Sequence, residues 1–125
     1  MKIAIATNDY TQVSGHAGQA RDWLLYDSDA ASDEPERIRL SKAQVFHHWE
    51  GEGTHPLDEV AVIVAASAGE GFRRRMDKRG VQVLLTGERD AARALRAVLN
   101  DEVLPDPTFD PSLLLCGLRD LFSRH

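Results

Sequence analysis

The first apolar segment of the chain carries apolar side chains on both faces of a predicted strand. Residues 2–7 read KIAIAT, so Ile3 and Ile5 point to one face while Ala4 and Ala6 point to the other. Strands that are apolar on both faces lie inside a sheet that is covered on both sides. The pattern therefore predicts a central strand at residues 2–7.

Two further strands follow through connections that are too short to contain helices. Residues 8–18 are rich in Asn, Asp, Ser and Gly and predict a loop. Residues 23–27 (WLLYD) predict the second strand, an acidic turn covers residues 28–35, and residues 36–46 alternate in part and predict the third. Strands joined so closely form an antiparallel meander.

The second half of the domain changes to a strand–helix–strand–helix pattern. Apolar residues 60–66 predict a strand, residues 70–79 a helix that Gly80 terminates, and residues 81–85 another strand. A second helix is predicted over residues 88–100, with an apolar stripe formed by Ala91, Ala94, Leu95, Val98 and Leu99. This order predicts a right-handed parallel crossover. The fold class is therefore α/β, with a five-stranded mixed sheet and helices packed on it.

The last part of the chain differs from the rest. We divide the sequence into an α/β domain at residues 1–103 and a tail at residues 104–125. Three prolines in residues 104–111 indicate a linker. A short amphipathic helix is then predicted, with Cys116 among its leucines, and Cys116 is interpreted as a small buried apolar residue.

Composition narrows the classes of function. The 125 residues suit one domain, and the net charge of −5 argues against binding a nucleic-acid backbone. A single cysteine excludes an intrachain disulfide and any multi-cysteine metal site within one chain. No apolar run approaches the roughly 20 residues of a membrane span. The chain enters its first strand directly after Met1-Lys2, so we expect a cytoplasmic protein.

His16 is the first candidate ligand among five histidines. It lies in the loop after the central strand, between Gly15 and Gly18, which would let the backbone approach a bulky ligand. Loops at this edge of an open α/β sheet form binding crevices. A neutral imidazole also suits iron. The alternative is a turn histidine that makes only a local hydrogen bond.

Two other segments carry candidate binding residues. Residues 47–56 hold His47, His48 and His55, of which His47 and His55 could close around a metal; the alternative is an exposed loop with incidental histidines. Gly69 and Gly71 begin a helix whose free N–H groups favour anions, and Arg73 would add positive charge. Ser67 is the predicted helix cap. The basic run at residues 73–79 is otherwise interpreted as a solvated helix face.

Three sequence segments together resemble the dinitrogenase iron–molybdenum cofactor biosynthesis family. The first consists of KIAIAT (residues 2–7), VSGHAG (13–18) and WLLYD (23–27). The second is HPL (55–57) leading into VAVIV (60–64). The third is GEG (69–71) with RGVQV (79–83) and the helix through Ala94. The resemblance covers about residues 1 to 100. It implies a ribonuclease-H-like fold and His16 as a cluster ligand. It also implies non-catalytic binding of the iron–molybdenum cofactor or an iron–sulfur precursor. Nitrogenase or other cofactor-assembly proteins would be its partners, and a homodimer stays open.

Two other functions remain open at this stage. The first is a regulatory or partner-binding module of the same fold, without a metallocluster, that acts through its tail helix. The second is a ribonuclease-H-like nuclease, which needs several converging carboxylates. Asp9, Asp27 and Glu70 are the available acids.

Overall fold

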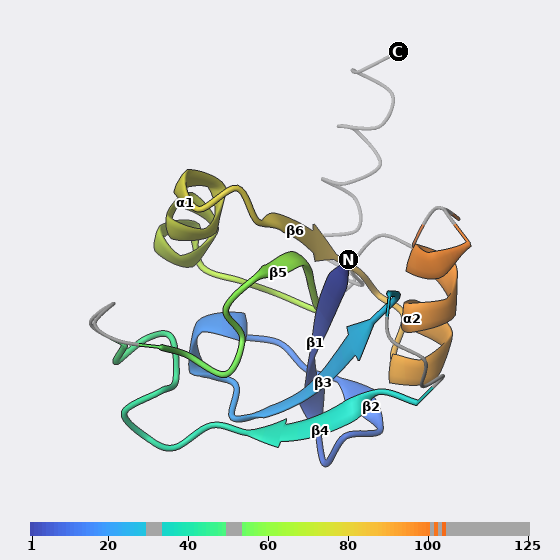
Figure 1. Cartoon of the computed structure of the whole chain (residues 1–125), viewed down its shortest axis with the longest axis horizontal. Helices are drawn as coiled ribbons and strands as arrows, with labels where there is room; N and C mark the ends of the chain where they lie inside the picture. The colour runs from blue at the N-terminus through green and yellow to red at the C-terminus, as the bar shows by residue number, and fades with distance from the viewer. Residues whose placement is uncertain (30–33, 50–53, 101, 103, 105–125) are drawn as a thin grey trace, which may run out of the picture.

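The computed structural model describes residues 1–29, 34–49, 54–100, 102 and 104. Its elements in chain order are β1 (Lys2–Asn8), β2 (Gln12–Val13), the 3₁₀ turn η1 (Ala17–Gln19), β3 (Asp22–Asp27), β4 (Glu36–Arg39), β5 (Val60–Ala65), α1 (Glu70–Lys78), β6 (Gln82–Leu85) and α2 (Ala91–Leu99). The strands form one mixed sheet in the order β4-β3-β1-β5-β6, and β2 pairs with β1. Figure 1 shows α1 and α2 on opposite sides of this sheet.

Strand β1 lies in the middle of the sheet, as its apolar faces predicted. It pairs antiparallel with β3, where Ile3 faces Tyr26, and parallel with β5, where Ile5 faces Val64. Strand β4 continues antiparallel from β3, and β6 continues parallel from β5. The predicted meander and the parallel second half are therefore confirmed. The sixth strand, β2, was not predicted, because two residues are too few to show a periodicity.

Each face of the sheet has its own apolar core. Ile3 and Ile5 contribute to the core beneath α2, with Ala91, Ala94 and Leu95 from the helix. Ala4 and Ala6 contribute to the core on the α1 side. The other buried members of that core include Trp23, Leu40, Val45, Phe46, Leu57, Ile63 and Met76. Residues on both faces of β1 are therefore removed from water, which stabilises its central position.

The prediction of a third strand over residues 36–46 is wrong at its C-terminal end, because β4 stops at Arg39. Leu40 and Phe46 are nonetheless 0% and 2% exposed. The chain turns after Leu40, and the N–H of Val45 donates to the carbonyl of Ser41 over 3.1 Å. These apolar side chains belong to turns that pack on the sheet. Residues 40–46 therefore show the same spacing of apolar positions that a paired strand would show.

The helices begin and end at recognisable signals. Helix α2 starts at Ala91 and not at residue 88, because the Asp90 carboxylate accepts hydrogen bonds from the N–H groups of Ala92 and Arg93. Gly80 ends α1 with a φ of 75°, and its N–H donates to Asp77, as predicted for a glycine cap.

Some sequence predictions fall on residues that the structure does not describe. The linker and the tail helix, with Cys116, lie outside the described residues. Within the described part of the chain, no helix has the length and apolar character that crossing a membrane requires.

Candidate functional site

The loop that carries His16 is joined to the segment that follows β5. Strands β1 and β5 run parallel, so both segments leave the same edge of the sheet. The carbonyl of Ser14 accepts a hydrogen bond from the N–H of Ala66 over 2.8 Å, and the N–H of Ala17 donates to the carbonyl of Ser67 over 3.0 Å. These bonds hold the two segments side by side.

His16 has a constrained backbone and an exposed side chain. Its φ and ψ are 53° and 56°, a left-handed conformation that is uncommon outside glycine. Its N–H donates to Ser67 Oγ over 2.8 Å, and its carbonyl accepts from the N–H of Gln19 over 2.7 Å. The imidazole is therefore presented to solvent from a turn whose backbone is hydrogen bonded on both sides.

A cleft of about 330 Å³ lies beside His16. Its volume falls at the lower end of the range typical of small-molecule sites. It is lined by Thr7, Asn8, Ser14, Gly15, His16, Gln19, Ala20, Arg21 and Asp22. Most of these residues are polar, and Asn8, Gln19 and Arg21 supply N–H donors. The cleft therefore suits a polar ligand that accepts hydrogen bonds.

Asp22 is the acidic residue of the cleft, and its charge is neutralised by Arg39 on β4. The Arg39 guanidinium donates to the two Asp22 carboxylate oxygens over 2.9 and 3.4 Å. This hydrogen bonding lowers the pKa of Asp22 below its ordinary value of 3.8, although desolvation acts in the opposite direction. The carboxylate thus stays ionised beside the cleft without presenting an unpaired negative charge.

The ion pair predicts a pH dependence of stability. A carboxyl group whose pKa is lower in the folded chain than in the unfolded chain stabilises the fold above its unfolded pKa. That contribution is lost as the pH falls through the folded pKa. We expect Asp22→Asn to be less stable than the parent at pH 7, with the difference shrinking below about pH 4. Urea unfolding at pH 7, 5, 4 and 3 measures this. A difference that stays constant over this range would contradict the prediction.

Ser14 places a buried hydroxyl group at the wall of the cleft. Within the described part of the chain, its Oγ has no hydrogen-bond partner, and the residue is 7% exposed. A buried polar group without a partner costs about 1 to 3 kcal/mol. We expect Ser14→Ala to raise the free energy of unfolding by about 1 kcal/mol. Urea unfolding of the two proteins at pH 7 decides this, and a less stable variant would show that the hydroxyl is satisfied.

The two other predicted metal ligands occupy different environments. His47 is exposed, and its N–H donates to the carbonyl of Gly18 over 2.6 Å, which brings its backbone next to the His16 turn. His55 is 5% exposed. Its Nε2 lies 2.7 Å from the carbonyl of Gln44, and its Nδ1 accepts from the N–H of Leu57 over 3.0 Å. Both ring nitrogens of His55 are therefore already used within the fold.

The structure does not collect the predicted metal ligands into one centre. Among the residues it describes, no three His, Cys, Asp or Glu side chains lie close enough together to hold a metal ion. Metal binding by His55 would require both of its hydrogen bonds to break. The metal-ligand role of His16 and His47 stays a prediction: His16 lines the cleft, and the backbone of His47 is bonded to Gly18 in the turn that carries His16.

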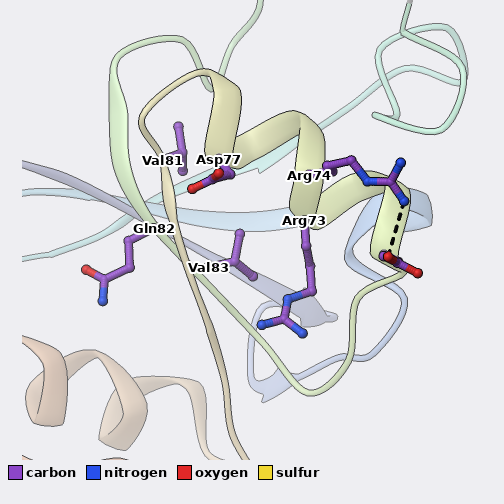
Figure 2. Close-up of a pocket in the computed structure, with 7 residues that line it drawn as sticks. Arg73, Arg74, Asp77, Val81, Gln82 and Val83 are labelled. Carbon is purple, nitrogen blue, oxygen red and sulfur yellow. Dashed lines mark ion pairs between the residues drawn. The ribbon is translucent and has the colours of Figure 1, made fainter.

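The N-terminus of α1 lies close to the His16 loop but opens into a different groove. A methyl group at Gly18 would come within 3.7 Å of Phe72 on α1, whereas Gly69 and Gly71 face open space. Arg73 lies in a groove of about 400 Å³ between α1 and β6. Figure 2 shows this groove, which is lined by Glu70, Arg73, Arg74, Asp77, Val81, Gln82 and Val83. The predicted binding residues are thus divided between the cleft beside His16 and the groove between α1 and β6.

Much of the basic run on α1 is engaged within the protein. Arg74 pairs with Glu70 over 3.2 Å in the bond drawn in Figure 2. Arg75 donates to the carbonyl of Phe46 over 2.7 Å, and Arg79 pairs with Asp58 over 3.2 Å. These contacts attach α1 to neighbouring segments, so the run is only partly a solvated helix face.

Ser67 belongs to this site, although the sequence predicted it as the N-terminal cap of α1. The N-cap of α1 is Gly69, and no side-chain hydrogen bond caps the helix. Ser67 instead accepts the hydrogen bond from His16, 51 residues earlier in the chain. No local pattern could reveal this contact, because it depends on the parallel pairing of β1 with β5.

The chain belongs to the dinitrogenase iron–molybdenum cofactor family, whose pattern it matches over residues 1–101. No curated protein is similar enough to count as a match. The solved structures that share the fold include two relatives of low sequence identity. The protein PH0822 is 15% identical with a TM-score of 0.64, over 85% of this chain and 96% of its own. The Thermotoga protein TM1290, described provisionally as a NifB protein of the DUF35 family, is 19% identical with a TM-score of 0.59, over 86% and 95% of the two chains.

Proposed function

We propose that this protein binds and carries the iron–molybdenum cofactor, or an iron–sulfur precursor of it, without catalysing a reaction on it. The observation that carries the proposal is the exposed imidazole of His16, held on a hydrogen-bonded turn at a polar cleft of about 330 Å³. Membership of the family supports the choice of cargo. The proposed site of action is the cytoplasm, and the proposed partners are nitrogenase or cofactor-assembly proteins.

The chemistry of a carrier fits a site with one principal ligand. In a preassembled cluster, sulfide already fills most coordination positions, so one protein ligand can hold a metal and later release it. A neutral imidazole binds iron. The N–H donors of Asn8, Gln19 and Arg21 could bond to the sulfides or other acceptor atoms of the cargo.

We also infer a ribonuclease-H-like topology for the domain. The antiparallel meander β1-β3-β4 followed by the parallel strands β5 and β6 supports this assignment. In that arrangement, the carboxyl ends of β1 and β5 border the loop that carries His16. The topology thus explains why a binding loop would occur at this edge.

Anaerobic binding of the isolated cluster tests the proposed function. The purified 125-residue chain is incubated with iron–molybdenum cofactor or with a [4Fe–4S] cluster, and the mixture is separated by size-exclusion chromatography without oxygen. We expect iron to elute with the protein at about one cluster per chain, with molybdenum in the first case. If neither cluster elutes with the protein, the proposed function is wrong.

The groove in Figure 2 favours a second candidate function, the binding of a partner protein. Among the described strands, β6 is an edge of the sheet, so its outer backbone groups can pair with an extended segment of another chain. Val81 and Val83 line the groove beside this edge. This function needs no metallocluster, and it would remain if both clusters failed to bind.

The geometry gives no comparable support for a nuclease. Asp27 pairs with Lys2 at the start of β1, whereas Asp9 follows its end. The length of β1 separates these acids by roughly 20 Å. Glu70 pairs with Arg74 on the surface of α1. The three carboxylates therefore do not converge on one metal site.

A further inference from the structure

We propose that Ser67 is a positioning residue that holds His16 in its ligand-presenting conformation. The inference rests on the proposed function for the role of His16, while the contact itself is a feature of the fold. Ser67 Oγ accepts the His16 N–H over 2.8 Å, and the Ser67 carbonyl accepts the Ala17 N–H over 3.0 Å. One residue thus binds two successive amides of the His16 turn.

The backbone of His16 needs this support. A φ of 53° is strained for a residue with a Cβ, and such conformations persist where surrounding contacts hold them. The bond from Ala66 to the carbonyl of Ser14 fixes the entrance to the turn, and the two bonds to Ser67 fix the following amides. Without the Ser67 hydroxyl, the His16 N–H would lose the one partner that it has among the described residues, and the turn could relax.

Gly15 provides independent evidence that the hydroxyl occupies a specific place. A Cβ at Gly15 would lie 2.6 Å from Ser67 Oγ, which is closer than real Cβ contacts allow. Among the described glycines, only Gly80 has a positive φ, so the conformation of Gly15 does not itself require glycine. Glycine at this position therefore leaves room for the Ser67 hydroxyl.

Gly18 offers a matched control in the same loop. A Cβ there would lie 3.7 Å from the Phe72 ring, which is an ordinary van der Waals contact. A methyl group at residue 18 should fit, whereas one at residue 15 must displace the Ser67 hydroxyl. The two alanine substitutions change the chain in the same chemical way and differ in their effect on one hydrogen bond.

The test compares Ser67→Ala, Gly15→Ala, the double variant and the control Gly18→Ala. The first readout is hydrogen exchange of the His16 amide, measured by NMR without any ligand. We expect exchange to be about fivefold to tenfold faster in both single variants, because a typical hydrogen bond is worth about that factor. The double variant should resemble either single variant, because all three lack the same bond. Gly18→Ala should exchange at the parent rate.

The second readout is the affinity for a reconstituted [4Fe–4S] cluster, with pulsed electron paramagnetic resonance to detect the nitrogen coupling of a bound imidazole. We expect Ser67→Ala to bind about fivefold more weakly, with a weakened or altered nitrogen coupling, and Ser67→Thr to restore both because it keeps the hydroxyl. Circular dichroism confirms that each variant is folded.

The outcomes separate this inference from the proposed function. If the His16 amide in Ser67→Ala exchanges at the parent rate, the positioning role is wrong, whatever the parent binds. If Ser67→Ala binds the cluster as tightly as a binding parent does, with the same nitrogen coupling, the positioning role is also wrong. If the parent binds no cluster, the carrier function fails, and faster exchange in Ser67→Ala still supports the hydrogen bond that holds the turn.

Discussion

His16→Ala is expected to weaken binding of the iron–molybdenum cofactor or its iron–sulfur precursor by at least about 100-fold. Loss of a group that merely supports a metal ligand lowers metal affinity by about 10- to 100-fold, and loss of the ligand itself should exceed this. No three of the described His, Cys, Asp and Glu side chains form a metal-binding group that could replace it. Anaerobic titration followed by iron analysis measures the affinity.

Two further variants make the His16 experiment specific. Alanine is strained at the positive φ of residue 16, so His16→Gly provides the same loss of imidazole without that strain. His48→Ala is the matched control, because His48 is also exposed but does not line the cleft beside His16. We expect His16→Gly to lose binding and His48→Ala to keep it. Parent-like affinity of His16→Gly would rule out the imidazole as the ligand.

His47→Ala shows whether the neighbouring histidine contributes. Its backbone is bonded to Gly18, so its side chain begins close to the turn that carries His16. An intermediate loss of affinity in His47→Ala would support a second ligand, and parent-like affinity would show that His47 is not a ligand.

His55→Ala is expected to lower the free energy of unfolding by about 3 to 5 kcal/mol. This loss is large for a residue in a segment that the sequence suggested could be an exposed loop. The substitution leaves the carbonyl of Gln44 and the N–H of Leu57 without their partners. Each unpaired buried group costs about 1 to 3 kcal/mol. It also removes a ring that stacks on Phe46, with centroids 4.7 Å apart, and meets the edge of Trp49 at 4.9 Å. The cavity adds a cost of its own.

Urea unfolding at pH 7 measures this effect, with His48→Ala as the control. A substitution of an exposed residue usually changes stability by no more than about 0.5 kcal/mol. A loss of less than about 1 kcal/mol in His55→Ala would show that the ring is not structural and would return it to the list of candidate ligands.

His16 and His55 differ in burial and therefore in the role that the fold gives to each ring. The core on the α1 side extends over Phe46, and the His55 ring completes it. The His16 ring lies outside this core, although the neighbouring Ala17 is buried in it, and the His16 backbone is hydrogen bonded to Ser67 Oγ and to the N–H of Gln19. The hydrogen bond to Ser67 therefore holds the His16 backbone in place and leaves the imidazole of His16 exposed to a ligand.

The sequence by itself determined the order of the elements and the place of the central strand. Apolar residues on both faces of residues 2–7 could be satisfied only by cover on both sides, and the structure supplies it with α1 and α2. The stripe of Ala91, Ala94 and Leu95 likewise determined the buried face of α2. These features were predictable because they depend on local periodicity and on the removal of apolar side chains from water.

The tertiary structure alone decided the end of β4 and the roles of the site residues. Leu40 and Phe46 are apolar because they cover the sheet, and spacing cannot distinguish covering from strand pairing. Five histidines look alike in a sequence, but only the fold shows that one ring is bonded at both nitrogens while another is exposed at a cleft. The contact between His16 and Ser67 joins residues 51 positions apart. It exists because parallel strands bring their carboxyl ends together, and that physical relation appears only when the sheet has formed.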